Sequence, residues 1–354
     1  MTYQAFAAQD EHREALERLW TESMSDRRIA AVRAQRWAWL YEDNPAGPAV
    51  TFVVKHVESD QLIGSASVYP REVIVSGREC KAGVLADFVT SKAHRVAGPA
   101  VMVQRAIANA HRERGLDFLF GYPNKGAAPI FPRLRFKTVG ESTLWVKPLR
   151  TARKIATYIH PVTAHMIAPF ANSVLAANDL RLAASRTTSY RATFDRLPDS
   201  AFDDLWEREK HLSPVSCVRN SAYLNWRYVK HTTERYQVFT LQSRDGDRVH
   251  GYVVYVVRDD RVFVADMFAE GREAGMESLL LDFCRRMRRR GHESVCVNYA
   301  GNDRFLASLR ALQFVKRADT RKLIAFVAKD QPDTFRETVY DQASWFMHDG
   351  ELDI

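Results

Sequence analysis

The chain has 354 residues, of which 46% are hydrophobic and 27% charged, and its net charge at pH 7 is +8. Two domains are predicted from this length, and the positive charge favours anionic partners such as phosphate groups, tRNA or an acidic membrane surface. The four cysteines form no C-x-x-C pair, so neither a disulfide scaffold nor a structural zinc site is expected. No secretory signal is expected, and no apolar stretch is long enough to span a membrane. A protein of the reducing cytoplasm is therefore expected.

The chain begins with helix-like segments and continues with strand-like ones. Residues 10–21 direct Leu16 and Leu19 towards a core, as an amphipathic helix does, and residues 28–41 predict a second helix. Residues 42–47, which include Asn, Pro and Gly, predict a turn. Strands are then predicted at residues 52–57, 63–69 and 72–75, and a turn is predicted at Ser76 and Gly77.

The stretch from residue 83 to residue 136 organises the chain. It predicts a strand, a turn and a helix in succession, at residues 84–90, 95–100 and 101–114. Gly98, followed two residues later by Ala100, lets backbone N–H groups approach a pyrophosphate at the start of the helix. Arg95 can add a charge-assisted contact, and Pro99 suits the first helical turn.

This turn resembles motif A of the GNAT acyltransferase superfamily, whose signature is Gln or Arg, two residues, Gly, one residue, and Gly or Ala. Arg95, Gly98 and Ala100 match that signature. The alternative is an ordinary α/β unit in which Gly98 serves only chain geometry. Gly115 then predicts the end of the helix, and a strand follows at 116–120.

The segment after that strand resembles motif B of the same superfamily. Asn124, Ala127 and Phe136 fall at the expected offsets of a short helix. Two residues depart from the motif, because Phe131 stands where the family usually has Tyr, and Arg135 stands where it usually has Gly.

The resemblance implies an α/β (α+β) fold with a mixed, mostly antiparallel sheet flanked by helices. It also implies acetyl-CoA or another acyl-CoA as donor substrate, and no metal. The residues for which it implies donor contacts are Phe88, Val89, Thr90, Arg95, Val96, Ala97, Gly98, Pro99, Ala100, Asn124 and Phe131.

Acyl transfer to an amine needs a polarised carbonyl, a deprotonated amine and a leaving thiolate. By the resemblance, a backbone N–H in the region from Val89 to Thr90 polarises the carbonyl. Asp87, near the carboxyl end of a central strand, is a candidate base, directly or through water, with a structural role as the alternative. Tyr122 is a candidate proton donor in place of the missing motif B Tyr, with a packed aromatic as the alternative. His94 is interpreted as a solvated neighbour of Arg95.

Residues 150–188 are predicted to form a helical linker. An apolar stripe at helical spacing follows basic residues at its start, and Pro161 and Pro169 interrupt it. A helical hairpin packed between domains is one interpretation. The other is an interfacial segment that touches an acidic membrane.

The second half repeats the first faintly. Residues 265–267, Gly291 and residues 312–314 echo residues 86–88, Gly115 and residues 134–136, and Trp226 echoes Trp39. Residues 272–277 are the second turn, equivalent to residues 95–100 of the first half. There Glu277 takes the place of the small residue two positions after Gly275, and its bulk and charge oppose pyrophosphate binding. Tandem GNAT-like domains are predicted at 1–149 and 189–330, with a tail at 331–354 and only the first copy binding the donor.

Three functions agree with these features. The first is an acyl-CoA-dependent N-acyltransferase that acts directly on a small-molecule amine or amino sugar, in an arrangement resembling mycothiol synthase. The second is an aminoacyl-tRNA-dependent transferase resembling the Fem family, the only alternative that would involve nucleic acid. The third is a non-catalytic acyl-CoA-binding or scaffold protein. A cytoplasmic location, with peripheral contact to the inner membrane face through residues 150–186, is expected.

Overall fold

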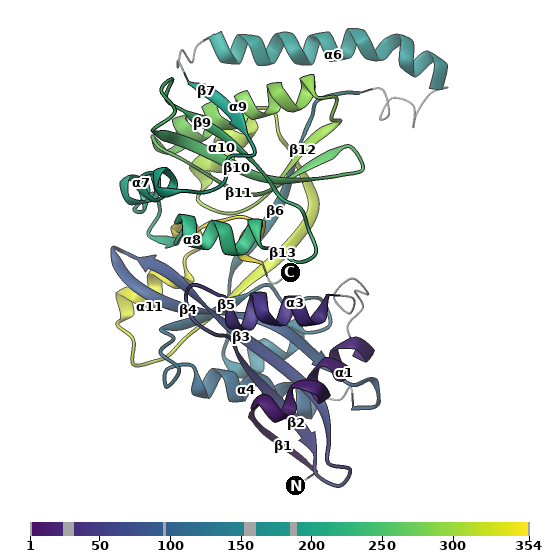
Figure 1. Ribbon diagram of the computed structural model, residues 1–354, viewed down its shortest axis with the longest axis vertical. Coiled ribbons are helices and arrows are strands. Elements are labelled where there is room, and N and C mark those ends of the chain that lie inside the picture. The colour runs from purple at the N-terminus through teal and green to yellow at the C-terminus, as the bar shows by residue number, and fades with distance from the viewer. Residues whose placement is uncertain (1, 24–31, 95–96, 152–160, 185–189, 353–354) are drawn as a thin grey trace.

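The computed structural model describes residues 2–23, 32–94, 97–151, 161–184 and 190–352. Its strands form one mixed sheet of 14 strands, with helices on both faces (Figure 1). The predicted α/β fold class is confirmed. Along the sheet the strand order is β1-β2-β3-β4-β5-β13-β6-β12-β11-β10-β9-β7, while β8 pairs with β3 and β14 pairs with β12.

The strands of the sheet divide between the two halves of the chain. Those of the first half are β1 (Tyr3–Ala7), β2 (Val50–His56), β3 (Gln61–Val75), β4 (Arg78–Thr90), β5 (Phe118–Gly121) and β6 (Lys137–Pro148). Those of the second half are β7 (Arg191–Phe194), β8 (Val215–Cys217), β9 (Gln237–Gln242), β10 (Val249–Arg258), β11 (Arg261–Ala269), β12 (Ser294–Gly301), β13 (Val315–Val327) and β14 (Phe346–Met347).

Helices and short helical turns connect these strands. The α-helices are α1 (Arg13–Ser23), α3 (Arg33–Trp37), α4 (Ala97–Ala110), α6 (Pro161–Ala184), α7 (Ser200–Glu209), α8 (Ser221–Leu224), α9 (Arg272–Arg289), α10 (Asp303–Ala311) and α11 (Asp333–Tyr340). The 3-10 turns are η1 (Asp10–His12), η3 (Lys92–His94), η4 (Ala128–Leu134), η6 (Gln342–Ser344) and η7 (Asp349–Glu351), and the π-helical turns are η2 (Ala38–Glu42) and η5 (Asn225–Val229).

The two strands predicted at 63–69 and 72–75 are one long strand, β3. Its partner β4 also starts earlier than predicted, at Arg78, because a tight hairpin joins the two strands. Ser76 and Gly77 have φ values of 49° and 84°, the left-handed conformation that two-residue hairpin turns require. The predicted turn at these residues is confirmed.

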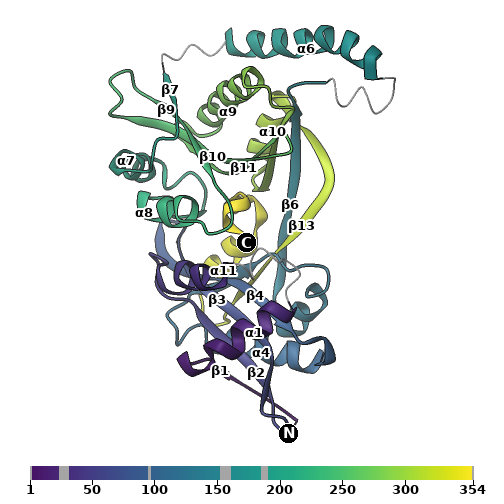
Figure 2. The same cartoon turned by 45° about the vertical axis from the view of Figure 1, so that its right-hand side comes forward.

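The halves exchange long strands. β13, from the end of the second half, lies between β5 and β6 of the first, and β6 pairs on its other side with β12 of the second half (Figure 2). The sheet therefore continues across the predicted boundary at residue 149, although the division into two domains stays a prediction. Because each half supplies a strand to the other, neither half has a complete sheet by itself.

A pair of tryptophans joins the halves on one face of the sheet. The indole N–H of Trp39 donates to the carbonyl of Trp226, and the indole N–H of Trp226 donates to the carbonyl of Trp39, each at 2.6 Å. The rings stack with centroids 5.4 Å apart. Both residues lie in π-helical turns, η2 and η5, so the sequence echo between them corresponds to equivalent local structure.

The segment predicted as a tail, residues 331–354, is folded as far as the structure describes it. It forms α11, η6, β14 and η7. Trp345 is fully buried, and Phe346 and Met347 are nearly so, because they pack into the hydrophobic cluster that both halves share. The C-terminal segment is therefore part of the core.

The predicted linker contains one long helix. α6 runs from Pro161 through Pro169 to Ala184 at one end of the molecule (Figure 1). Residues 152–160 and 185–189 lie outside the described part of the chain, and so do Ile155 and Ile159 of the predicted apolar stripe.

Candidate functional site

A β-bulge interrupts the central strand β4. Ser67 of β3 pairs with Ala86, and Ser65 pairs with Val89, so Asp87 and Phe88 together lie opposite one residue of β3. Asp87 has a φ of 47°, the left-handed conformation that Asp adopts more readily than most residues. A bulge disrupts the ladder locally and redirects the strand, and bulges are over-represented beside active sites.

β4 and β5 pair over only a short distance. Their parallel register runs from Ala82 to Val84 on β4, and the bulge follows three residues later. Beyond this point the carboxyl end of β4 leads through η3 towards α4, and β5 ends at Gly121. Ligands of α/β proteins bind at the carboxyl ends of such diverging strands.

The predicted pyrophosphate turn lies at the start of α4. Gly98 is exposed, and a Cβ placed on it would meet no atom within 4 Å. Pro99 and Ala100 are buried and fix the first helical turn against the sheet. The backbone at Gly98 is therefore open to a phosphate at the N-terminus of a 14-residue helix. Arg95 and Val96 lie outside the described residues, as does the side chain of Ala97.

Asp87 is held in a buried network below the bulge. Nη1 and Nη2 of Arg36 donate to its two carboxylate oxygens at 2.7 and 2.8 Å, and the hydroxyl of Tyr41 donates at 2.5 Å. Ser67 shares the Tyr41 hydroxyl at 2.7 Å. Burial and the neighbouring Asp87 raise the pKa of Tyr41 well above its usual range, so this phenol stays protonated. The network ties the carboxylate to α3 and η2, and this arrangement favours the structural role for Asp87.

The motif B residues have different surroundings. The half-buried Tyr122 directs its hydroxyl to the sulfur of Met347 at 3.7 Å, and burial raises its pKa well above the usual range. The carboxamide oxygen of Asn124 accepts the N–H of Ala127 at 2.9 Å, so it shapes the turn before η4. Phe131 is buried and packs edge-on against Phe136. Its side chain therefore belongs to the core beside α4.

Arg135 adopts the conformation that explains the usual glycine of motif B. Its φ is 65°, and its backbone N–H closes the end of η4. Gln313, one residue before Phe314 in the second half, has a φ of 66°. The side chains of Arg135 and Gln313 are exposed. Their packing therefore does little to offset the backbone strain of the left-handed conformation.

The second half has an equivalent bulge and buried ion pair. Val254 pairs with Asp266 and Tyr255 pairs with Val264, which leaves Ala265 as the extra residue on β11. Asp266 accepts Nε of Arg219 at 3.0 Å, and both side chains are fully buried. The same Arg–Asp combination therefore supports a bulge in each half.

The C-terminal segment fills the space beyond the bulge of the second half. Phe346 and Met347 of β14 pair with Gly301 and Ala300 of β12, past the point where β11 and β12 stop pairing. η7 follows and lies against β11, and its Gly350 accepts Nε of Arg227 at 2.9 Å. A Cβ on Gly350 would come within 1.8 Å of the Tyr228 hydroxyl, so the fit is close.

The second turn is also occupied by the chain itself. A Cβ on Gly275 would lie 1.7 Å from the carbonyl oxygen of Glu270, whereas Gly98 is open. The N–H of Gly271 donates to the Glu209 carboxylate at 3.1 Å. A backbone carbonyl and a carboxylate therefore already lie at the start of α9, in addition to Glu277, which the sequence indicated.

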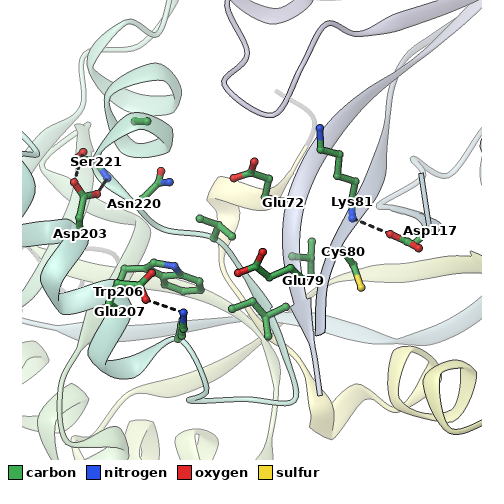
Figure 3. Close-up of a pocket in the computed structure, with 15 residues that line it drawn as sticks. Glu72, Glu79, Cys80, Lys81, Asp117, Asp203, Trp206, Glu207, Asn220 and Ser221 are labelled. Carbon is green, nitrogen blue, oxygen red and sulfur yellow. Dashed lines mark hydrogen bonds and ion pairs between the residues drawn. The ribbon is translucent and has the colours of Figure 1, made fainter. Parts of the chain in front are cut away.

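A cavity of about 630 Å³ lies at the opposite end of β4. Figure 3 shows Glu72 and Glu79 pointing from the β3–β4 hairpin towards Trp206 and Asn220 of the second half. Cys80 in its wall is seven residues before Asp87, about 23 Å along an extended strand. The cavity is therefore separate from the bulge and from the start of α4.

No family model matches the sequence, and no curated protein matches it, but solved structures do. A probable N-acyltransferase from Enterococcus faecalis aligns with 95% of this chain and 74% of its own, at 12% identity and a TM-score of 0.65. A GCN5-related N-acetyltransferase from Anabaena variabilis aligns with 92% and 72%, at 13% identity and a TM-score of 0.64. The chain has the GNAT fold. N-myristoyltransferase of Saccharomyces cerevisiae, with bound myristoyl-CoA, shares the GNAT fold over 92% of this chain and 82% of its own, at 10% identity and a TM-score of 0.57.

Sequence reasoning did not find several parts of this GNAT-fold site. Arg36 and Tyr41 bind Asp87 from about 50 residues away, and nothing in their spacing signals that contact. The bulge at Asp87 and Phe88 was not predicted either, although the non-glycine left-handed position is one that Asp favours. The donor contacts assigned to Val89, Thr90 and the other turn residues stay predictions.

Proposed function

We propose that the chain is an acyl-CoA-dependent N-acyltransferase whose donor binds the first half. The observation that carries the proposal is the combination of a bulge at Asp87 and Phe88 with an open Gly98 at the start of α4. These features place an irregular backbone segment where a thioester carbonyl would lie, and helix N-terminal N–H groups where a pyrophosphate would lie. The solved N-myristoyltransferase that shares the fold holds myristoyl-CoA, which supports a CoA thioester as donor.

The donor is expected to extend from α4 to the bulge. Its pyrophosphate lies at Gly98 and Ala100, with Arg95 adding a positive charge as the motif A resemblance implies. Its thioester carbonyl accepts a hydrogen bond from the backbone of the bulged segment, which stabilises negative charge on the oxygen as the tetrahedral intermediate forms.

The reaction is direct transfer in a ternary complex. The lone pair of a primary amine attacks the thioester carbon, a C–N bond forms, and the C–S bond breaks to release the CoA thiolate. The attacking amine loses one proton to a water molecule, and the thiolate takes one up. Tyr122, directly after β5, is the proposed proton donor in place of the missing motif B Tyr. Its raised pKa keeps the phenol protonated but weakens it as an acid towards a thiolate, so its contribution is expected to be about tenfold. A small-molecule amine or amino sugar is the proposed acceptor.

The second half acts as a structural partner that shapes the acceptor side. This tandem arrangement is supported by the shared bulge, the shared Arg–Asp pair and the reciprocal Trp39–Trp226 contact. Its own donor space contains the C-terminal segment, and its turn is covered by Glu270. One donor equivalent per chain is therefore expected, in an arrangement similar to the two-domain mycothiol synthase and Fem proteins.

Donor binding tests the site assignment directly. Gly98→Glu places bulk and negative charge at the open turn and should lower CoA affinity at least tenfold in calorimetry, because a carboxylate opposes a pyrophosphate at a helix N-terminus. Asn109→Glu adds the same charge on an exposed position near the other end of α4 and should leave affinity unchanged. Equal CoA affinity in a folded Gly98→Glu protein would contradict the assignment.

A second candidate function is a non-catalytic acyl-CoA-binding protein. It is favoured by the Asp87 carboxylate, which Arg36 and Tyr41 already engage, and by Tyr122, whose hydroxyl contacts a thioether. A thiol-release assay with acetyl-CoA and longer acyl-CoAs against a panel of amines separates the two functions. Donor binding without thiol release for any amine would select the binding protein.

A further inference from the structure

Helix α6 presents an apolar face away from the rest of the protein. It lies across one end of the molecule in both views (Figures 1 and 2). Phe170, Val174 and Leu180 on this helix are 75%, 55% and 56% exposed. Large apolar side chains with such exposure on one helix indicate an interaction surface.

The rotation of α6 about its axis is fixed by its inner face. Asp179 is buried and accepts Nζ of Lys147 at 2.7 Å and also binds Arg288. Asn172 accepts the backbone N–H of Thr151 at 2.9 Å. At about 100° per residue, Phe170, Val174 and Leu180 lie within an arc of about 120° centred opposite Asp179. The ion pairs therefore hold the apolar arc outward.

Arginines lie on this outer face and beside it. Arg181 is exposed on the helix itself, and Arg285 of α9 lies beside Ala183 in a small hollow. Arg150 is exposed next to Thr151, on the inner side of the helix, and its Nη2 donates to the carbonyl of Arg288 on α9 at 3.3 Å. Among the described residues, no ion pair involves Arg150, Arg181 or Arg285, and the nearby carboxylates of Asp179 and Asp282 are each paired with an arginine. Arg181 therefore lies within the exposed arc itself, and Arg150 and Arg285 form a positively charged rim on the side of the helix that faces α9.

We propose that the outer face of α6 docks on an acidic lipid bilayer. Phe170, Val174 and Leu180 enter the boundary between headgroups and acyl chains, while Arg150, Arg181 and Arg285 contact lipid phosphates. The helix lies in the plane of the membrane surface, with its exposed apolar arc towards the lipid. No helix of the described chain is long and apolar enough to cross a membrane.

The charge of the rim selects this occupant over a second copy of the chain. Two copies facing each other through α6 would bring their arginine rims together without carboxylates to neutralise them, whereas anionic lipids supply the opposite charge. The apolar arc carries no acidic side chain among its described residues, so nothing on it repels lipid phosphates.

Vesicle sedimentation with the full chain tests the proposal. The protein should bind vesicles of phosphatidylcholine mixed with phosphatidylglycerol, and binding to pure phosphatidylcholine should be at least tenfold weaker. Phe170→Ser/Val174→Ser/Leu180→Ser should weaken binding to the acidic vesicles at least tenfold, because three apolar side chains no longer leave water. The matched control is Val57→Ser/Leu197→Ser/Val315→Ser, which removes three exposed apolar side chains elsewhere.

Measurements of folding and of oligomeric state show whether a loss of vesicle binding comes from the changed surface. Circular dichroism and CoA affinity should be the same in both triple variants and the wild type, since all the changed side chains are exposed. Arg181→Glu/Arg285→Glu should abolish the preference for acidic vesicles. Absence of vesicle binding at low salt, or equal loss in the control variant, would overturn the proposal. Self-association that depends on Phe170, Val174 and Leu180, without vesicle binding, would assign the face to a second copy.

Discussion

The two buried Arg–Asp pairs allow the bulge of the first half to be tested against an internal control. Arg36 binds both oxygens of Asp87, and these side chains are 4% and 3% exposed. Breaking a buried pair by removing one charge leaves the other uncompensated and costs about 3–5 kcal/mol. Asp87→Asn should therefore lower the free energy of unfolding by about that amount, since it keeps the shape of the side chain but not its charge.

The matched change in the second half is Asp266→Asn. Its partner Arg219 keeps a second carboxylate, Glu351, so the loss of stability should lie at the lower end of the same range, about 3 kcal/mol. The catalytic consequences should differ. Asp87→Asn should lower kcat at least tenfold because the bulge that polarises the thioester moves, and displacements of about 1 Å can cost 10²-fold. Asp266→Asn should leave kcat within about twofold, since its bulge faces the C-terminal segment.

Denaturant unfolding and thiol release, both measured where each variant is folded, check this expectation. Arg36→Met separates positioning from base catalysis, because it leaves the Asp87 carboxylate in place. If Arg36→Met keeps wild-type turnover while Asp87→Asn abolishes it, Asp87 acts as a base and the positioning role is wrong. Equal loss of turnover in Asp87→Asn and Asp266→Asn would refute the assignment of catalysis to the first half.

Further predictions concern the proposed proton donor Tyr122, CoA binding at the second turn, the pH dependence of stability and backbone strain at two left-handed residues. Tyr122→Phe should lower kcat about tenfold with donor affinity within about twofold, because the hydroxyl makes only a weak thioether contact; wild-type turnover would leave water as the proton source. Glu277→Ala should add no second CoA equivalent in calorimetry, since the backbone still covers the second turn. Burial lowers the pKa of His348 from 6.5 to about 4, so the unfolded chain binds more protons between these values. Stability should therefore fall by about 2 kcal/mol from pH 7.5 to 5 through this group, and His348→Gln should flatten that slope in denaturant titrations at both pH values. Arg135→Gly and Gln313→Gly should each raise the free energy of unfolding by about 0.5–1 kcal/mol by relieving a left-handed φ, and a decrease would show that the side chains make contacts that matter.

The local pattern of the first half was readable from the sequence. The spacing of Gly98 and Ala100 at the start of a periodic helix, the apolar runs before and after it, and the Ser76–Gly77 turn all depend on neighbouring residues, whose backbone preferences act over a few positions. The resemblance to the GNAT superfamily rested on the same short motifs, and the fold agrees with it. Even the glycine missing from motif B was a local signal, since Arg135 adopts the conformation that glycine would favour.

Long-range contacts decided the rest, and single residues do not encode their partners. A strand such as β13 has the same alternating pattern whichever neighbour it pairs with, so the exchange of β6 and β13 between halves could not be read from periodicity. Asp87 carried the signature of a base, but whether its carboxylate meets water or Arg36 depends on how α3 packs on the sheet. The C-terminal segment was predicted as a tail beyond the repeated half. It is core because the second half leaves a space between β11 and β12 that Phe346 and Met347 fill. Tertiary packing thus determined that the space beyond the second bulge is filled, because only packing brings the C-terminal segment against β12.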